Sequence, residues 1–342
     1  MEITLNPELE RFFKRCHQNL KNTDKNRFLG QIIHKVQEKS LQKALHKAGF
    51  HEFLKPHSEW PSLYISTQAF LKSPYHQAIH LDKIQSSNFH YSQEIILGHE
   101  LFNLSAIVFD PQRELNDSMV LRALDENYKA TFLWQGDEVW MLDAPSEAAT
   151  IDPIAQKAHG DILTFGLGIG YYVYMACLNP QVKSITVIEQ SQAVIDLFMK
   201  DLLPQFPTHI PIHIQQGDAF DYYNEAFLKK YDHVFVDIYQ SSEDGYPILE
   251  KLCEQVQAPF EQVDFWIESS CFEVYPSLIF LVFEALAKHK PLRQIAPEYQ
   301  KISRKIEAYF KLNNRILDDV DSLKHYMYEP EVHRQIAAMK ED

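Results

Sequence analysis

The sequence DILTFGLGIG at residues 161–170 decides the fold, because it joins an apolar stretch to a glycine-rich loop. Ile162–Phe165 predict a buried strand. Glycines at 166, 168 and 170 predict a tight turn, since a residue without a Cβ lets the chain bend sharply and lets a ligand touch the backbone. A helical stretch around Val173 follows, so free N–H groups at a helix start would lie next to the loop.

Strand and helix patterns alternate after this loop, as they do in a parallel sheet. The further strands are predicted at 184–188, around Ile212, at 233–236 and at 265–267, and the helices at 192–203 and 248–256. The sequence therefore predicts an α/β fold with a Rossmann-like, doubly wound and mostly parallel sheet. After residue 285 no sixth or seventh strand is evident, because 298–327 has a helical pattern.

The segments before the loop predict a helical region and a β-hairpin. Residues 1–50 are expected to be helical, with an apolar stripe in the core or at an interface (Leu29, Ile32, Ile33, Val36, Leu41 and Leu45) and a stop at Gly49. A strand is expected at 104–109. The strands 130–134 and 138–142 form a hairpin around Gly136, and 148–157 forms a weak helix.

Three regions follow from these patterns. Residues 1–150 are expected to form the N-terminal helical region with the hairpin, as a substrate lid or an interface. Residues 151–290 would form the Rossmann-like domain, and residues 291–342 a helical C-terminal extension.

Acidic residues follow three of the predicted strands. Glu189 ends the second strand, 19 residues after Gly170, and Asp218 and Asp237 end the third and fourth strands. Because ligands of open α/β sheets bind at the carboxyl ends of the strands, these acids should line one crevice. A carboxylate at about 20 residues from the loop is typical of one that binds a ribose diol.

With these residues, the segment from about 130 to 270 resembles the class I S-adenosyl-L-methionine (SAM)-dependent methyltransferases, and within them the spermidine-synthase-like branch. The resemblance implies that the loop cradles the methionine part of SAM, that Glu189 binds the ribose hydroxyls, that Asp218 accepts from the adenine amine and that Asp237 lies near the sulfonium. The predicted cofactor-binding residues are Gly166, Leu167, Gly168, Gly170, Glu189, Gln190, Asp218, Ala219 and Asp237.

The sequence departs from the family at three positions. Thr164 stands where an acidic residue commonly binds the SAM amino group, Ile169 replaces the aspartate of the spermidine-synthase loop, and Gln240 replaces the second acid of its Asp-x-x-Asp pair. A cationic amine would lose two anionic partners, each worth about 1.5–3 kcal/mol. Aminopropyl transfer is therefore disfavoured. A dinucleotide is disfavoured too, because Tyr171 stands where its fingerprint has the third glycine or an alanine.

The predicted function is a SAM-dependent methyltransferase that acts on a small-molecule acceptor. Asp237 is the candidate catalytic base, with Tyr239 as a second candidate. Two alternatives stay open. One is a polyamine aminopropyltransferase-like enzyme that uses decarboxylated SAM, and the other is a non-catalytic SAM-binding or protein-binding module.

Composition limits the partners. A net charge of −14 makes nucleic acid an unlikely partner, although residues 1–60 carry 11 lysines and arginines against 7 aspartates and glutamates. The four cysteines have no zinc-like spacing, and we expect no metal, a reducing cytoplasmic setting and no membrane span. His76 and His80 have the spacing of half a metal site but lack a partnering motif. Whether the chain forms a homo-oligomer is left open.

Overall fold

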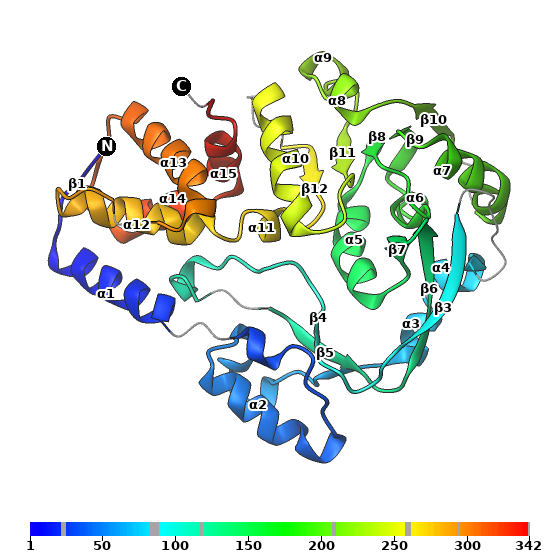
Figure 1. The fold of residues 1–342 in the computed structure, drawn as a ribbon, viewed down its shortest axis with the longest axis horizontal. Helices are drawn as coiled ribbons and strands as arrows, with labels where there is room; N and C mark the ends of the chain where they lie inside the picture. The colour runs from blue at the N-terminus through cyan, green and yellow to red at the C-terminus, as the bar shows by residue number, and fades with distance from the viewer. Residues whose placement is uncertain are drawn as a thin grey trace.

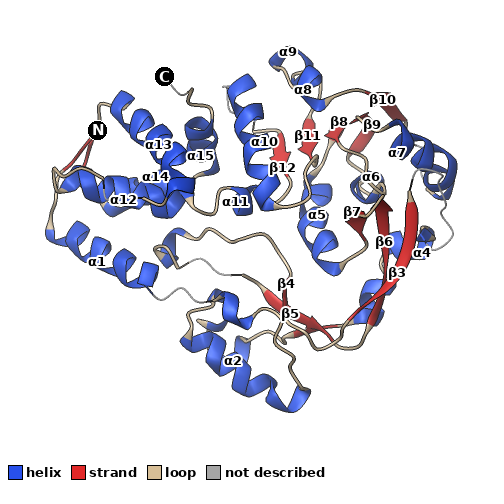
Figure 2. Cartoon of the chain, in the orientation of Figure 1, coloured by secondary structure: helices blue, strands red, loops and turns tan. Residues whose placement is uncertain are grey.

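A five-stranded parallel sheet lies at the centre of the computed structural model, which describes residues 1–21, 25–81, 89–116, 119–206, 210–256, 261–292 and 295–340. Its strand order is β10-β9-β8-β11-β12, which places the first strand of the predicted unit in the middle. The bounds are β8 (Gly160–Phe165), β9 (Val182–Glu189), β10 (Ile212–Gln216), β11 (His233–Val236) and β12 (Val263–Phe265). This arrangement confirms the predicted α/β, Rossmann-like fold (Figure 2).

Helices connect and cover these strands. Those next to the sheet are α5 (Pro145–Lys157), α6 (Tyr171–Cys177), α7 (Gln192–Leu197), α8 (Ala219–Tyr222), α9 (Glu225–Leu228), α10 (Ser242–Gln255) and α11 (Glu268–Cys271). Most residues of the three central strands, β8, β9 and β11, are buried, as expected for strands covered on both faces, whereas the edge strand β10 exposes His213, Gln215 and Gln216. In the described part of the chain, no helix combines the length and the apolar character that crossing a membrane requires.

The predicted hairpin is confirmed. β6 (Tyr128–Gln135) and β7 (Glu138–Leu142) pair antiparallel around Gly136, whose φ is +64°, and β3 (His90–Ile96) pairs with the other edge of β6. A second small sheet contains β2 (Tyr64–Ile65), β5 (Leu121–Leu124) and β4 (Phe102–Asn103). The short helices α3 (Thr67–Leu71) and α4 (Pro74–Ala78) lie between β2 and β3 along the chain.

The strand predicted at 104–109 is wrong, because β4 already ends at Asn103. The side chain of Asn103 accepts the N–H of Val120 at 3.1 Å, a donor that a continuing ladder would give to a backbone carbonyl. The local apolar pattern is therefore overridden by a side-chain hydrogen bond.

The N-terminal stripe is only partly buried. The chain forms α1 (Pro7–Lys21) and α2 (Glu38–Lys47), and Gly49, with φ +78°, follows the end of α2 as predicted. Leu45 is buried, but Val36 is 91% exposed, and Leu29 and Ile32 are exposed too. Ile33 and Leu45 are core residues, but the described residues between α1 and α2 form turns and short 3-10 helices, so the members of the stripe do not share one helical face.

The two ends of the chain pack together. β1 (Glu2–Ile3) pairs in parallel with β13 (Ile316–Leu317), and α1 contacts α12 (Tyr275–Ala287) and α14 (Val320–Tyr328). Figure 1 shows the blue N-terminal helix beside the orange helices. β13 interrupts the continuous helical pattern that the sequence suggested for 298–327. The domain boundaries at 150 and 290 stay predictions, although α5 runs across residue 150.

A buried lysine joins the C-terminal helices to the sheet domain. Lys305 lies on α13 (Gln300–Leu312) and is 2% exposed. Its Nζ lies 3.0 Å from a carboxylate oxygen of Glu250 and 2.7 Å from one of Glu254, both on α10, and donates to the carbonyl of Ala337 at the end of α15 (Pro330–Ala337). A buried charge of this kind is tolerated because each of its donors has a partner.

Replacing Lys305 with methionine should destabilise the protein by about 3 kcal/mol, because buried Glu250 loses one of its two lysine partners and the carbonyl of Ala337 loses its donor. Urea unfolding measures the difference. Lys301→Met is the matched control: Lys301 lies one turn away on α13 and pairs with Glu250 at 2.6 Å, but its side chain is 45% exposed. We expect it to cost less than about 1 kcal/mol. Equal costs for the two variants would contradict this account of Lys305.

Candidate functional site

A cleft of about 630 Å³ opens at the carboxyl ends of the central strands. Its volume lies in the range of about 300–1,000 Å³ that is typical of small-molecule sites. Nine of the ten residues predicted to form the site line it: Gly166, Leu167, Gly168, Glu189, Gln190, Asp218, Ala219, Asp237 and Tyr239. The fold thus brings together residues that are up to 73 positions apart in the sequence. Their roles stay predictions.

Two glycines of the loop, Gly166 and Gly168, have close neighbours that leave little room for a Cβ. Gly166 has φ +91°, and a Cβ on it would lie 1.9 Å from the carbonyl oxygen of Asp237. Gly168 has φ +52°, and a Cβ there would lie 2.6 Å from the terminal methyl of Met141, a flexible group that lines the cleft. Only glycine suits residue 166, where the obstacle is backbone.

Gly170 is the one predicted residue that does not line the cleft. It precedes α6 with φ +72°, and a Cβ on it would lie 2.6 Å from the ring of Phe198. Its conformation starts the helix and lets the helix pack closely, so the structure does not support a direct ligand contact for it.

Glu189 ties the loop to the neighbouring strand. One of its carboxylate oxygens accepts the N–H of Leu167 at 2.9 Å, and the other accepts the N–H of Ser191 at 2.7 Å. The carboxylate therefore faces the glycine loop, and burial raises its pKa. Each oxygen keeps a second lone pair, so the group can still accept from a ligand hydroxyl. Asp218 caps α8 by accepting the N–H of Phe220 at 2.9 Å.

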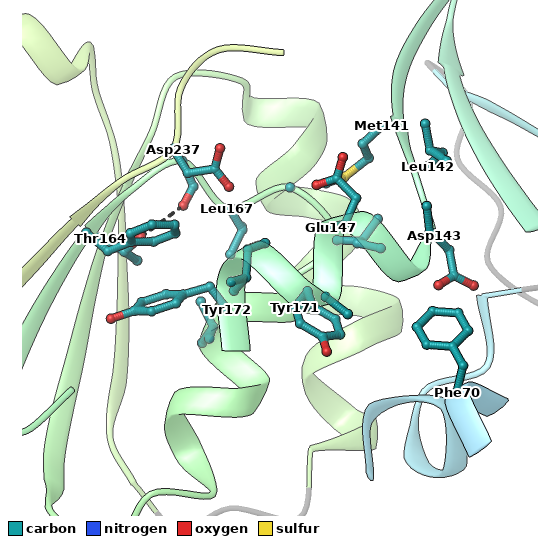
Figure 3. Close-up of a pocket in the computed structure, with 18 residues that line it drawn as sticks. Phe70, Met141, Leu142, Asp143, Glu147, Thr164, Leu167, Tyr171, Tyr172 and Asp237 are labelled. Carbon is teal, nitrogen blue, oxygen red and sulfur yellow. Dashed lines mark hydrogen bonds between the residues drawn. The ribbon is translucent and has the colours of Figure 1, made fainter. Parts of the chain in front are cut away.

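A fourth carboxylate, Glu147, reaches the cleft from α5. Burial raises its pKa to about 7. Asp237 is affected more strongly: burial, followed by the charges of Glu147 and Glu189, raises its pKa well above the ordinary value. Figure 3 shows the carboxylates of Glu147 and Asp237 facing one another across the site. Sequence reasoning missed Glu147, because it belongs to no motif and only the packing of α5 against the loop brings it there.

The cleft is lined by acidic side chains. Four carboxylates line it, from Glu147, Glu189, Asp218 and Asp237, whereas no lysine, arginine or histidine is among the described residues that do so. The side-chain carboxylates of Glu147 and Asp237 have no hydrogen-bond or ion-pair partner within the described ranges. Carboxylates that lie close together favour protonation of one of them or the binding of a cation.

Tyr239 does not suit the role of a base. Its ring lines the cleft, but its hydroxyl donates to the carbonyl oxygen of Trp266. Burial raises its pKa well above the ordinary value, so the phenolate is disfavoured. The second candidate base is therefore better explained as a packing residue of the cleft wall.

His76 takes part in a hydrogen-bond network. Its Nε2 lies 2.6 Å from a carboxylate oxygen of Asp143, its Nδ1 lies 2.7 Å from the hydroxyl of Ser73, and Tyr128 donates to the other oxygen of Asp143. The network joins α4 to the residue after β7. No group of three ligand-type side chains that could hold a metal ion occurs in the part of the chain that the structure describes.

No family model matches the sequence, and no curated protein matches it. Three solved structures resemble parts of the chain. An S-adenosylmethionine-dependent methyltransferase from Clostridium acetobutylicum ATCC 824 is 15% identical, with a TM-score of 0.23 over 35% of this chain and 45% of that one. A candidate SAM-dependent methyltransferase from Streptococcus mutans is 13% identical, with a TM-score of 0.25 over 36% of each chain. Mycobacterium tuberculosis shikimate dehydrogenase is 12% identical, with a TM-score of 0.23 over 55% of this chain and 64% of that one.

The chain thus spans less than half the length of the two methyltransferases and less than two thirds of the dehydrogenase. These likenesses are to parts of the fold only. The residues of the cleft are therefore the basis for a function.

Replacing Glu147 with glutamine should stabilise the protein at pH 8 by about 1–3 kcal/mol and change its stability little at pH 5. The folded state raises the pKa of this carboxyl from 4.5 to about 7, so its contribution to stability is complete below 4.5 and is lost as the pH rises through 7. Glutamine cannot ionise and avoids that loss. Urea unfolding at both pH values measures the effect.

Glu138→Gln, at the exposed end of the hairpin, is the control, and its free energy of unfolding should change little at either pH. If Glu147→Gln stabilises the protein equally at pH 5 and at pH 8, the result would argue against burial of an ionisable group at this position.

Proposed function

We propose that this protein is a SAM-dependent methyltransferase that transfers a methyl group to a small-molecule acceptor. One observation carries the proposal: a glycine loop and four carboxylates line one cleft that no described cation lines. SAM carries a sulfonium and an ammonium group, and both are positively charged. The pyrophosphate of a dinucleotide is anionic, so the same cleft would repel it.

The positions of the residues fit the parts of the cofactor. Glu189 would accept from the ribose hydroxyls through the lone pairs that the backbone leaves free, as the resemblance to the family implies. Asp218 would accept from the adenine amine, and Gln190 and Ala219 would lie beside the base. Backbone of the Gly166 loop would cradle the methionine part. Placement within the spermidine-synthase-like branch is part of this proposal.

The bound cofactor would supply the reactive methyl group, and the protein would supply alignment, exclusion of water and one proton acceptor. Asp237 would hold the proton that the acceptor loses. Burial and the charges of Glu147 and Glu189 raise the pKa of its carboxyl well above the ordinary value. A bound cation beside it would lower this pKa and so favour the ionised form that accepts a proton.

The hairpin supports an acceptor of small size. Trp140, Met141 and Leu142, at the end of β7, form one wall of the cleft opposite the strand ends. This apolar wall would restrict access and exclude water from the reacting atoms, which is the role of the lid that the sequence predicts.

Isothermal calorimetry should show that the protein binds SAM and its product S-adenosylhomocysteine, and binds NAD at least tenfold more weakly. Gly168→Ala should weaken the binding of both adenosyl ligands about tenfold, because the added methyl group would lie within the cleft wall beside Met141. Gly136→Ala is the matched control: Gly136 also has a positive φ, but its Cβ would meet nothing within 4 Å. It should leave binding unchanged.

This panel separates the alternatives. A preference for decarboxylated SAM would favour aminopropyl transfer. Binding of SAM without any turnover would favour a non-catalytic module. Absence of binding to any adenosyl ligand would reject the proposed function.

Asp237→Asn should keep the affinity for S-adenosylhomocysteine within about threefold and lower turnover by about 10² to 10⁴. S-adenosylhomocysteine is the right binding probe, because its thioether carries no charge that the substitution would leave unpaired. Turnover is followed by mass spectrometry of a metabolite extract incubated with isotopically labelled SAM. Full turnover by the variant would remove Asp237 from the mechanism.

A further inference from the structure

The strand that precedes the glycine loop lacks an acid at the cleft. Thr164 is 1% exposed and neutral, and its hydroxyl lies 3.5 Å from the carbonyl oxygen of Gly166. A ligand ammonium that leaves water needs an anionic partner, because an unpaired buried charge is costly. Thr164 cannot be that partner, so a cationic ligand group here requires a carboxylate from another element.

Glu147 meets that requirement from α5. Its side chain lines both the main cleft and a smaller cavity of about 40 Å³, and Gly166 and Asp237 line both spaces as well. Thr164 lines the smaller cavity too. The cavity therefore adjoins the cleft at these shared residues, and this region is called the inner end of the cleft below. Its volume suits a group of about the size of a water molecule, which needs roughly 10–15 Å³, and an ammonium is of that size.

The charges around this inner end favour a cation over a neutral group. Glu147 and Asp237 face one another, and Glu189 is close enough to add to the field at Asp237. No described lysine, arginine or histidine lines either space. An ammonium beside Glu147 would give this carboxylate a charge-assisted partner, which it lacks among the described residues, and would offset its repulsion with Asp237.

We propose that Glu147 is a cofactor-binding residue that holds the α-ammonium group of SAM, in place of the acid that Thr164 replaces. This inference rests on the proposed function and adds to it the residue that recognises the amino-acid end of the cofactor.

Two ligands that differ only in that end test the assignment. S-adenosylhomocysteine carries the α-ammonium, whereas 5′-methylthioadenosine has the same adenosyl thioether without the amino-acid group. Calorimetry with the whole 342-residue chain should show that Glu147→Gln weakens the binding of S-adenosylhomocysteine by about tenfold to a hundredfold. This is the effect expected from the loss of one charge-assisted hydrogen bond. The affinity for 5′-methylthioadenosine should stay within about twofold. Glu138→Gln, on the exposed hairpin, should change neither.

The outcomes are distinct. A selective loss for S-adenosylhomocysteine supports the role of Glu147. An equal loss for both ligands shows a structural effect on the cleft, and no loss for either shows that Glu147 does not reach the ligand; both overturn the inference while the proposed function stands. If the wild-type protein binds neither ligand, the proposed function itself fails.

Discussion

The contact between Gly166 and the backbone of Asp237 is the constraint on which the cleft depends. The ends of β8 and β11 approach so closely that a single Cβ at residue 166 would overlap the carbonyl oxygen of Asp237. The same turn presents the N–H of Leu167 to Glu189 on β9. One glycine therefore allows three adjacent strand ends to meet, and the crevice between them follows from that approach.

That geometry has an electrostatic cost. It concentrates carboxylates where water is partly excluded, and burial raises the pKa of Glu147, Glu189 and Asp237. A protein retains such a cluster when a bound ligand can neutralise it, since perturbed ionisable groups in a cleft are typical of functional sites. The cost is local, because elsewhere buried charges such as Lys305 are paired.

The remaining elements hold this crevice in place and limit access to it. The hairpin strand β7 supplies an apolar wall, and the network around His76 fixes the chain just after that strand. On the other side of the sheet domain, the helices α13 and α15 are joined to α10 through Lys305. The N-terminal helix α1 completes the C-terminal helical group, so both ends of the chain stabilise one region that lies outside the cleft.

The sequence by itself determined where along the chain the five parallel strands lie, and also the hairpin, the glycine turn and the three acids at strand ends. Each of these depends on local periodicity or on a residue type at a fixed place relative to a strand, and local patterns survive in any packing. Only the tertiary structure decided that Glu147 enters the cleft, that the hydroxyl of Tyr239 is used by Trp266 and that Val36 is exposed. Those facts depend on how segments distant in the chain pack against one another, for which a single sequence has no periodic signal.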